Sequence, residues 1–268
     1  MLSALCQVYA LCPLLFATVC SYALCPLRFA KVSAVKVVIL CGGQGTRLKE
    51  KTDSIPKPLV EVGGRPILWH IMKIYSAYGF NDFILCLGYK GDLIKAYFKQ
   101  HHEKDWNLEF ADTGEATQTG GRIKRIEPLI DNETFMVTYG DGVADLNLKE
   151  LLEFHQKHGR IGTVTAANPP SQFGLLNFDE KGCVQKFQEK PQIDRWINGG
   201  FFVFQKTFFK YLTDDCILEK EPLERLSSDK QLFAWKHSSF WKCMDTYKDT
   251  VVLNELWNGG KAPWKTWS

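Results

Sequence analysis

The chain has 268 residues, of which 45% are hydrophobic and 24% are charged, and its formal net charge is +3. This balance is typical of a globular protein with a substantial core, and it excludes an intrinsically disordered chain. The small net charge favours neither nucleic acid nor an anionic membrane surface, so we expect no partner of either kind.

The first 34 residues differ from the rest of the chain in their repetitive sequence pattern. The run Tyr9–Ala17 recurs as Tyr22–Ala30, and the first cation is Arg28, so the basic start of a signal peptide is missing. Two prolines in this segment disfavour a transmembrane helix. We therefore predict that residues 1–34 are a repetitive extension outside the fold and that translation starts near Val35. Residues 35–268 are then expected to form one domain.

Nine cysteines occur in the chain, four of them within the first 25 residues. The later five form no C-x-x-C pair, and Cys41, Cys86 and Cys183 lie in apolar runs that predict strands. We interpret these residues as reduced thiols in or near the core of a cytoplasmic protein.

An apolar, β-branched run from Val35 to Cys41 predicts a strand that is buried on both faces of a parallel sheet. It is followed at once by a loop with three glycines, Gly42-Gly43-Gln44-Gly45-Thr46-Arg47. Such a loop places backbone N–H groups at the carboxyl edge of the sheet, where α/β folds bind anions. Arg47 and Lys57 add two cations, so we predict a site for a triphosphate.

Two other interpretations of the glycine loop remain open, namely a plain tight turn and a dinucleotide-binding loop. The spacing Gly-Gly-x-Gly differs from the G-x-G-x-x-G pattern of NAD-dependent oxidoreductases. Pro56 and Pro58 are expected to hold Lys57 in a stiff extended segment, which a dinucleotide loop does not need. Taken alone, Lys57 is better explained as a solvated loop lysine.

Helical and strand patterns alternate after this loop. Apolar residues recur with a helical period from Pro66 to Tyr78, and Phe83–Leu87 is a second apolar strand-like run. A second helix is predicted around Ile94–Phe98 and a weaker strand at Leu108–Ala111. This alternation predicts right-handed βαβ units and a parallel sheet.

A further strand, Phe135–Thr138, ends in Tyr139-Gly140-Asp141-Gly142. An aspartate between glycines at the carboxyl end of a strand stays open to a ligand, so Asp141 is a candidate metal ligand. The alternative is an ordinary Asp-Gly β-turn. A helix over residues 147–158 and a strand over residues 162–167 follow.

Short strands become more frequent from Asn168 onward. Leu175–Phe178 and Val184–Phe187 flank a hairpin-turn sequence, and Phe201–Phe204 predicts a buried strand. The last predicted elements are a short helix at 222–226, a strand at 231–236 and a helix at 245–257, for which Asp245 is the expected N-cap.

Several ordered blocks together resemble the signature of the sugar-phosphate nucleotidylyltransferases. The run Leu48–Thr52, with Glu50 where many members carry proline, is similar to their glucose-1-phosphate cytidylyltransferase branch. The resemblance covers Val35 to the end of the chain. It implies a Rossmann-like α/β fold with a mostly parallel, mixed sheet flanked by helices and a smaller β-rich sugar-binding part. The blocks are Gly42–Leu48, Pro56–Pro58, Thr138–Asp145, Phe187–Pro191, Ile197–Phe202, Phe240–Thr246 and Gly260–Trp267.

The resemblance also implies a role for each matching residue. Arg47, Lys57 and Asp141 would be catalytic, and Asp141 and Asp245 would bind Mg²⁺. The sugar phosphate would be held by Glu189, Lys190, Asn198 and Gly199, which on their own read as ordinary surface residues. The nucleotide would be bound by Leu40, Cys41, Gly42, Gly43, Gln44, Gly45, Thr46, Thr117, Arg122 and Gly140.

The segment Asp112–Arg122 is similar to the segment with which the family recognises base and ribose, although by itself it suggests a polar loop and a helix cap. The stretch before it departs from the cytidylyltransferases. Members of that branch carry a longer loop here, whereas this chain crosses directly from His101 to Glu109. In those members the longer loop can contact the nucleotide or a neighbouring subunit, and we do not assign such contacts to this chain.

The reaction implied by the resemblance is nucleotidyl transfer from CTP to α-D-glucose 1-phosphate, giving CDP-glucose and pyrophosphate for deoxysugar and O-antigen-type polysaccharide synthesis. Mg²⁺ is the implied cofactor, and a cytoplasmic homo-oligomer is the implied form. One alternative is an enzyme that uses dTTP or UTP with the same sugar phosphate. Another is a non-catalytic regulatory relative, which we would expect to have lost Arg47, Lys57, Asp141 or Asp245, all of which are present.

Overall fold

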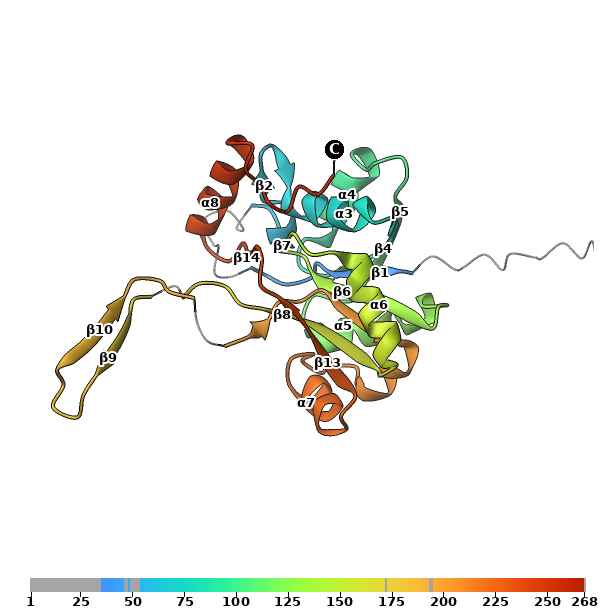
Figure 1. The fold of residues 1–268 in the computed structure, drawn as a ribbon. Coiled ribbons are helices and arrows are strands. Elements are labelled where there is room, and N and C mark those ends of the chain that lie inside the picture. Colours follow the sequence, from blue (N-terminus) through green and yellow to red (C-terminus); the bar gives the residue numbers. More distant parts are fainter. Residues whose placement is uncertain (1–34, 46–47, 49–53, 172, 193–194, 268) are drawn as a thin grey trace, which may run out of the picture. The chain divides into compact units, whose positions relative to one another are not determined.

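The computed structural model describes residues 35–45, 48, 54–171, 173–192 and 195–267. The predicted N-terminal extension lies outside these residues, as do Thr46 and Arg47. The described chain is built around an eight-stranded mixed sheet with the strand order β11-β8-β12-β6-β1-β4-β5, in which β13 also pairs with β8 (Figure 1). Its strands are β1 (Val37–Leu40), β4 (Asp82–Leu87), β5 (Asn107–Asp112), β6 (Thr134–Tyr139), β8 (Gly162–Ala167), β11 (Ile197–Asn198), β12 (Phe202–Gln205) and β13 (Leu232–His237).

The part of the sheet that carries the glycine loop is parallel. Strand β1 pairs in parallel with both β4 and β6, and β4 pairs in parallel with β5. Strand β12 then runs antiparallel to β6 and β8, so the sheet is mixed as a whole. The predicted fold class is therefore confirmed, and the carboxyl ends of β1 and β6 meet at one edge.

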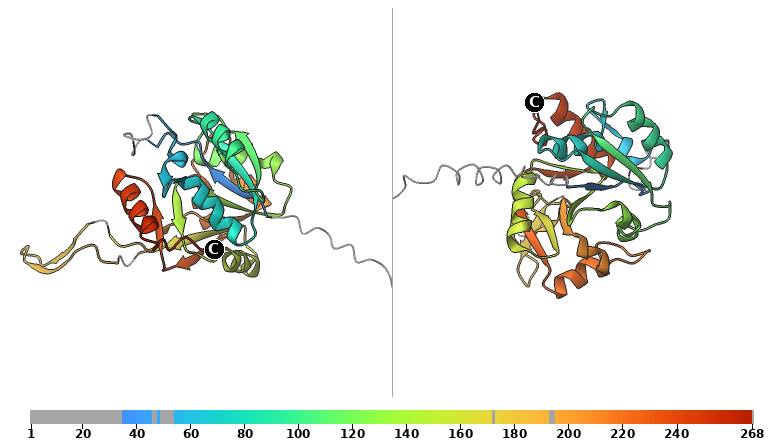
Figure 2. Two further views of the ribbon diagram at one scale, coloured as in Figure 1. Left: turned by 90° about the horizontal axis from the view of Figure 1, so that it is seen from above. Right: turned by 90° about the vertical axis from the view of Figure 1, so that its right-hand side faces the viewer.

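Helices cover both faces of the sheet because β1 is apolar on both sides. Val37 and Ile39 pack into one buried cluster with residues of α3 (Ile67–Ala77), α4 (Gly91–Gln100) and α6 (Leu148–His158). Val38 and Leu40 pack into a second cluster with residues of α5 (Thr119–Arg125) and α7 (Glu221–Ser228). Figures 1 and 2 show α3 and α4 on one side of the sheet and α7 on the other. None of the helices in the described residues is both long and apolar enough to span a membrane.

Within the described residues, three small antiparallel ribbons supplement the sheet, and the ribbon of β7 and β14 contributes residues to the second cavity described below. Strand β7 (Gly142–Ala144) pairs with β14 (Trp241–Cys243), and β2 (Glu61–Val62) pairs with β3 (Arg65–Pro66). Short 3₁₀ helices connect larger elements of the described chain, namely η2 (Lys57–Leu59), η3 (Glu127–Leu129) and η4 (Lys206–Tyr211).

The third ribbon is the predicted hairpin of β9 (Leu175–Phe178) and β10 (Val184–Gln188), whose residues are all exposed. Cys183 lies in this hairpin and is exposed too, so its predicted place in or near the core is wrong. The apolar run that contains it forms an exposed ribbon rather than an inner strand. Cys41 and Cys86 are buried free thiols, as predicted.

The last helix, α8 (Tyr247–Asn258), starts later than the sequence predicts. Its N-cap is Thr246, whose side chain accepts a hydrogen bond from the backbone N–H of Asp249, and the Asp249 side chain caps Thr246 in return. This reciprocal pair is a capping box, which satisfies two donors of the first turn. The expected N-cap role of Asp245 is therefore wrong, because its neighbour takes that position.

Candidate functional site

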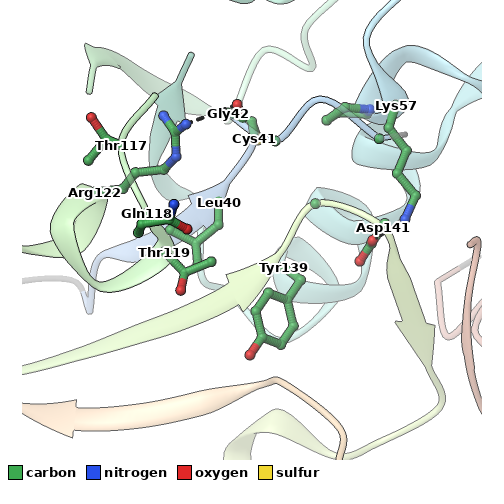
Figure 3. Close-up of a pocket in the computed structure, with 14 residues that line it drawn as sticks. Leu40, Cys41, Gly42, Lys57, Thr117, Gln118, Thr119, Arg122, Tyr139 and Asp141 are labelled. Atoms are coloured by element: carbon green, nitrogen blue, oxygen red, sulfur yellow. Dashed lines mark hydrogen bonds and ion pairs between the residues drawn. The ribbon is translucent and has the colours of Figure 1, made fainter. Parts of the chain in front are cut away.

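Two neighbouring cavities open at the edge where β1 and β6 end. The first has a volume of about 340 Å³ and the second about 300 Å³, and Tyr139 and Asp141 line both of them. Both fall within the size range of small-molecule sites. Most residues with a predicted nucleotide role line the first cavity, namely Leu40, Cys41, Gly42, Gly43, Gly45, Thr117, Arg122 and Gly140, together with Lys57 and Asp141 (Figure 3).

Gln44 and Thr46 are the other two residues with a predicted nucleotide role. Gln44 is exposed and lines neither cavity. Thr46 lies outside the described residues, and so does the predicted catalytic residue Arg47. The roles of these three residues stay predictions.

Arg122 holds the walls of the first cavity together. Its guanidinium donates to the carbonyl oxygens of Leu87 at 2.9 Å, Gly114 at 2.8 Å and Gly42 at 3.0 Å. These contacts tie the glycine loop to the end of β4 and to the segment before α5, as the dashed line to Gly42 in Figure 3 indicates. Burial lowers the pKa of Arg122. Its terminal nitrogens also donate to the hydroxyl of Thr113 and to the carbonyl oxygen of Glu115, and among the described residues no carboxylate forms an ion pair with it.

The glycines beside Arg122 are needed for space rather than for backbone conformation. A Cβ atom added to Gly42 would lie 2.0 Å from Arg122 Nη1, and one added to Gly88 would lie 2.5 Å from the same atom. Both distances are shorter than any van der Waals contact, so a side chain at either position would displace the guanidinium. The sequence predicted that the backbone of this loop lies close to a ligand. In the structure, the backbone at Gly42 lies close to the guanidinium of Arg122, a residue of the protein itself.

Lys57 connects the two predicted metal ligands. Its Nζ donates to Oδ2 of Asp141 at 2.5 Å and to Oδ1 of Asp245 at 2.7 Å. Figure 3 shows the lysine side chain pointing toward Asp141 at the cavity wall. Burial lowers the pKa of Lys57, but the two carboxylates outweigh this effect and raise its pKa above the usual value. The lysine is therefore a charged residue of the site and not the solvated loop lysine of the alternative interpretation.

The ribbon of β7 and β14 explains why two aspartates so distant in sequence meet. Gly142 pairs with Cys243, so Asp141 directly before β7 lies beside the segment directly after β14. The backbone N–H of Met244 also donates to the carbonyl oxygen of Asp141 at 2.9 Å. On the other side, Pro56 is extended as predicted, but Lys57 begins the 3₁₀ helix η2 and is not itself part of an extended segment.

Cys243 lies beside these carboxylates without being a nucleophile. Its Sγ is 3.5 Å from Oδ2 of Asp245. Burial first, and then the negative charges of Asp245 and Asp141, raise the pKa of this thiol to about 12. The thiol consequently keeps its proton at neutral pH and acts as a weak donor to Asp245.

The second cavity contains only part of the predicted sugar-phosphate set. Asn198, Gly199 and Asp245 line it, together with Tyr139, Glu219 and Trp241, which have no role in the sequence predictions. Trp241 fixes the loop at Gly199 by donating to its carbonyl oxygen at 2.7 Å. Tyr139 lies within one of the recognised sequence blocks, which offered a signal for it, whereas nothing in the sequence around Glu219 distinguishes it.

Glu189 and Lys190 line neither cavity. They follow β10 directly, are more than half exposed, and form an ion pair with each other at 3.2 Å. Their predicted role toward the sugar phosphate stays a prediction.

The chain resembles known nucleotidyl transferases over most of its length. A family model described as nucleotidyl transferase matches residues 36–242. The glucose-1-phosphate cytidylyltransferase of Salmonella typhi is 48% identical over 257 residues, covering 87% of this chain and 100% of the relative. A probable glucose-1-phosphate cytidylyltransferase of Bacillus subtilis is 45% identical over 255 residues, with the same coverage of both chains.

Solved structures agree with these sequence relatives. The crystal structure of HddC from Yersinia pseudotuberculosis complexed with GMP-PN has a TM-score of 0.68 and 27% identity, and it covers 83% of this chain and 99% of that one. A putative glucose-1-phosphate thymidylyltransferase from Bacillus anthracis, at 19% identity and a TM-score of 0.65 over 88% of this chain and 98% of that one, supports the fold alone. The chain therefore belongs to the nucleotidyl transferase family and, within it, to the glucose-1-phosphate cytidylyltransferases.

Proposed function

We propose that this protein transfers a cytidylyl group from CTP to α-D-glucose 1-phosphate and releases pyrophosphate, forming CDP-glucose. The observation that carries the proposal is the cluster of Lys57, Asp141 and Asp245 where two cavities adjoin. Two ligands bound side by side in these cavities would meet at one cluster of charges. The 48% identity to a glucose-1-phosphate cytidylyltransferase over 87% of this chain supports this choice of substrates.

The transfer step needs no covalent intermediate with the protein. A phosphate oxygen of the sugar phosphate attacks the α-phosphorus of CTP in line, a new P–O bond forms, and the bond to pyrophosphate breaks. The contribution of the chain is positioning and charge neutralisation. Lys57 stabilises the negative charge on the reacting phosphates, Arg122 adds positive potential at the first cavity, and Arg47 holds the leaving pyrophosphate.

Asp141 and Asp245 fit a divalent cation. Their carboxylate oxygens already converge on one positive charge, the Nζ of Lys57. Among the described residues no group of three or more His, Cys, Asp or Glu side chains forms a metal cage. Mg²⁺ is commonly held by one or two carboxylates plus substrate phosphates, which is the donor set available here. The bound ion would neutralise negative charge on the nucleotide phosphates.

Cytosine recognition is assigned to the first cavity, between Leu40 and the segment Thr113–Arg122. The carbonyl oxygen of Leu40 accepts a hydrogen bond from the backbone N–H of Gly140 at 3.1 Å, and a carbonyl oxygen has two lone pairs. An acceptor that pairs with the amino group of cytosine is left without a partner when uracil binds, which costs roughly 1–3 kcal/mol. We therefore expect kcat/KM for CTP to exceed that for UTP by at least about tenfold.

The exposed hairpin supports the prediction of a homo-oligomer. Val184 faces Phe178 and Phe187 faces Leu176 across the ribbon, so four apolar side chains share one unpartnered face. An exposed apolar strand surface of this kind is typical of a protein interface. We place the protein in the cytoplasm and its product in deoxysugar and O-antigen-type polysaccharide synthesis, as the family resemblance implies.

The test is release of pyrophosphate from each of CTP, UTP, dTTP and GTP with glucose 1-phosphate and Mg²⁺. We expect CTP to be preferred by at least about tenfold in kcat/KM. Equal kcat/KM values for all four nucleotides would still indicate a nucleotidyl transferase but would rule out a preference for CTP. No turnover with any nucleotide would favour the non-catalytic relative.

A further inference from the structure

Glu219 is the carboxylate of the second cavity that no sequence pattern pointed to. It lies two residues before α7 and lines the cavity together with Asn198 and Tyr139. The residue itself is exposed rather than buried in the core. A carboxylate at the wall of a cavity can accept hydrogen bonds from a ligand, so the contacts that orient it decide what it can do.

Both oxygens of Glu219 are held by hydroxyl donors from other elements. Tyr139, at the end of β6, donates to Oε1 at 2.5 Å, and Thr119, at the start of α5, donates to Oε2 at 2.8 Å. Thr119 in turn accepts from the backbone N–H of Leu218 at 2.9 Å, which fixes the direction of its own proton. The carboxylate is thus anchored from the rim of the first cavity while it lines the second.

The anchored carboxylate keeps the capacity to bind a ligand. An ionised carboxylate offers about four lone-pair positions, and Tyr139 and Thr119 use one position on each oxygen. No cation forms an ion pair with Glu219 within the part of the chain that the structure describes. Burial and the charge of Glu219 raise the pKa of Tyr139, so the phenol stays a donor to the carboxylate. Asn198 donates to the same phenol oxygen at 3.1 Å, which joins a predicted sugar residue to this network.

We propose that Glu219 recognises the sugar: its carboxylate accepts a hydrogen bond from a hydroxyl group of the sugar phosphate while Tyr139 and Thr119 hold it in place. This assignment rests on the proposed function, because it requires a sugar phosphate in the second cavity. Sugar hydroxyls are donors, and hydrogen bonds to a charged acceptor are roughly twice as strong as those between neutral groups. Glu219 therefore selects the acceptor substrate and leaves the nucleotide to the first cavity.

The first experiment compares Glu219→Gln and Glu219→Ala with Glu221→Gln, a control two residues along the chain whose side chain pairs with Arg225 and lines neither cavity. Loss of a hydrogen bond to a charged group corresponds to about a ten- to hundredfold change. We expect KM for glucose 1-phosphate to rise by about this factor in both Glu219 variants, and KM for CTP to change by less than about threefold. The control should match the wild-type protein in both constants.

The second experiment uses monodeoxy analogues of glucose 1-phosphate and separates direct contact from a structural role. In the wild-type protein, removing the hydroxyl that Glu219 binds should lower kcat/KM by about tenfold or more. The same analogue and glucose 1-phosphate should be nearly equal substrates for Glu219→Ala, since the partner is already missing. Equal losses of kcat/KM for every analogue in both proteins would overturn the assignment of Glu219 but not the proposed function. Wild-type KM values in both Glu219 variants would do the same. Failure of the wild-type protein to use glucose 1-phosphate at all would overturn the proposed function together with it.

Discussion

Lys57 and Lys190 both form ion pairs with carboxylates, but the ion pairs differ in exposure, in distance and in the sequence separation of the partners. The Lys57 side chain is 12% exposed and bridges two aspartates at 2.5 and 2.7 Å. The Lys190 side chain is 51% exposed and lies 3.2 Å from Glu189, its neighbour in the chain. The first pair is therefore held by the fold, whereas the second is held only by adjacency in the sequence.

The difference shows that contacts between distant segments, and not neighbours in the sequence, provide the environment of Lys57. The partners of Lys57 come from positions 84 and 188 residues away and are brought together by the ribbon of β7 and β14. An exposed ion pair such as Lys190–Glu189 contributes about 0–1 kcal/mol because water competes for both groups. Removing one partner of a more buried pair costs several times as much. The predictions that follow test this contrast, beginning with the largest expected effect.

Replacing Lys57 by methionine should have the largest effect. Lys57→Met removes the charge that faces the reacting phosphates and leaves two aspartates side by side without their cation. We expect kcat to fall by at least about 10²–10³, the loss for one electrostatic stabiliser. The measurement is steady-state pyrophosphate release. Lys242→Met is a matched control, because Lys242 also pairs with an aspartate, at 2.6 Å, but lines neither cavity. A similar loss in both variants would show that Lys57 acts only through stability.

Replacing Asp141 by asparagine should leave the fold intact and remove one metal ligand. We expect Asp141→Asn to lose turnover by about 10²–10³. It should also bind Mn²⁺, used as a spectroscopic substitute for Mg²⁺, more weakly in the presence of nucleotide. Near-normal turnover at low Mg²⁺ would contradict the assignment, and an unchanged circular dichroism spectrum serves as the check on folding.

Replacing Lys190 by alanine should affect the sugar phosphate and nothing else. If Lys190 reaches the phosphate during turnover, Lys190→Ala raises KM for glucose 1-phosphate by about tenfold, since one charge-assisted hydrogen bond is lost. Its melting temperature should stay at the wild-type value because the ion pair with Glu189 is exposed. Wild-type kinetics in this variant would mean that Lys190 is an ordinary surface residue, and Lys181→Ala, in the turn of the same hairpin, is the control.

The hairpin that precedes Lys190 offers a change that should act on assembly. Phe178→Ser with Phe187→Ser removes two aromatic side chains from its apolar face, which are 67% and 62% exposed. We expect the oligomer to dissociate toward monomer at micromolar concentration, as measured by light scattering coupled to gel filtration. The unfolding temperature of the monomer should be unchanged because neither ring packs into the core. An unchanged mass for the variant would exclude this face as the contact between copies.

The smallest expected effect concerns pH. The folded state raises the pKa of Lys57 above its usual value of 10.5, so it binds this proton more tightly than the unfolded chain does. The resulting stabilisation is complete below about pH 10.5 and is lost as pH rises through the folded-state pKa. The difference in free energy of unfolding between the wild-type protein and Lys57→Met should therefore shrink above that pH. Urea unfolding of both proteins at pH 9 and pH 11 would reveal a constant difference if this coupling were absent.

The sequence by itself determined the features that depend on neighbouring residues. The apolar run of β1, the glycine loop after it and the alternation of helices and strands are local patterns. They were sufficient for the fold class. The family and most of the residues that line the first cavity came from the resemblance of the ordered sequence blocks to the sugar-phosphate nucleotidylyltransferases. The glycine loop alone left a tight turn and a dinucleotide-binding loop open, and Gly42 was recognisable only together with Arg47, Lys57 and the other blocks of the resemblance.

Only the tertiary structure decided the features that depend on contacts between distant segments. Arg122 donates hydrogen bonds to four carbonyl groups and to the hydroxyl of Thr113, and Glu219 is held by hydroxyls from two other elements. Asp245 pairs with Lys57, while its neighbour Thr246 takes the N-cap of α8. The physical reason is that the sequence pattern gives the type of a side chain and its local period. The identity of its partners follows from strand pairing and packing over long separations, which no local pattern encodes.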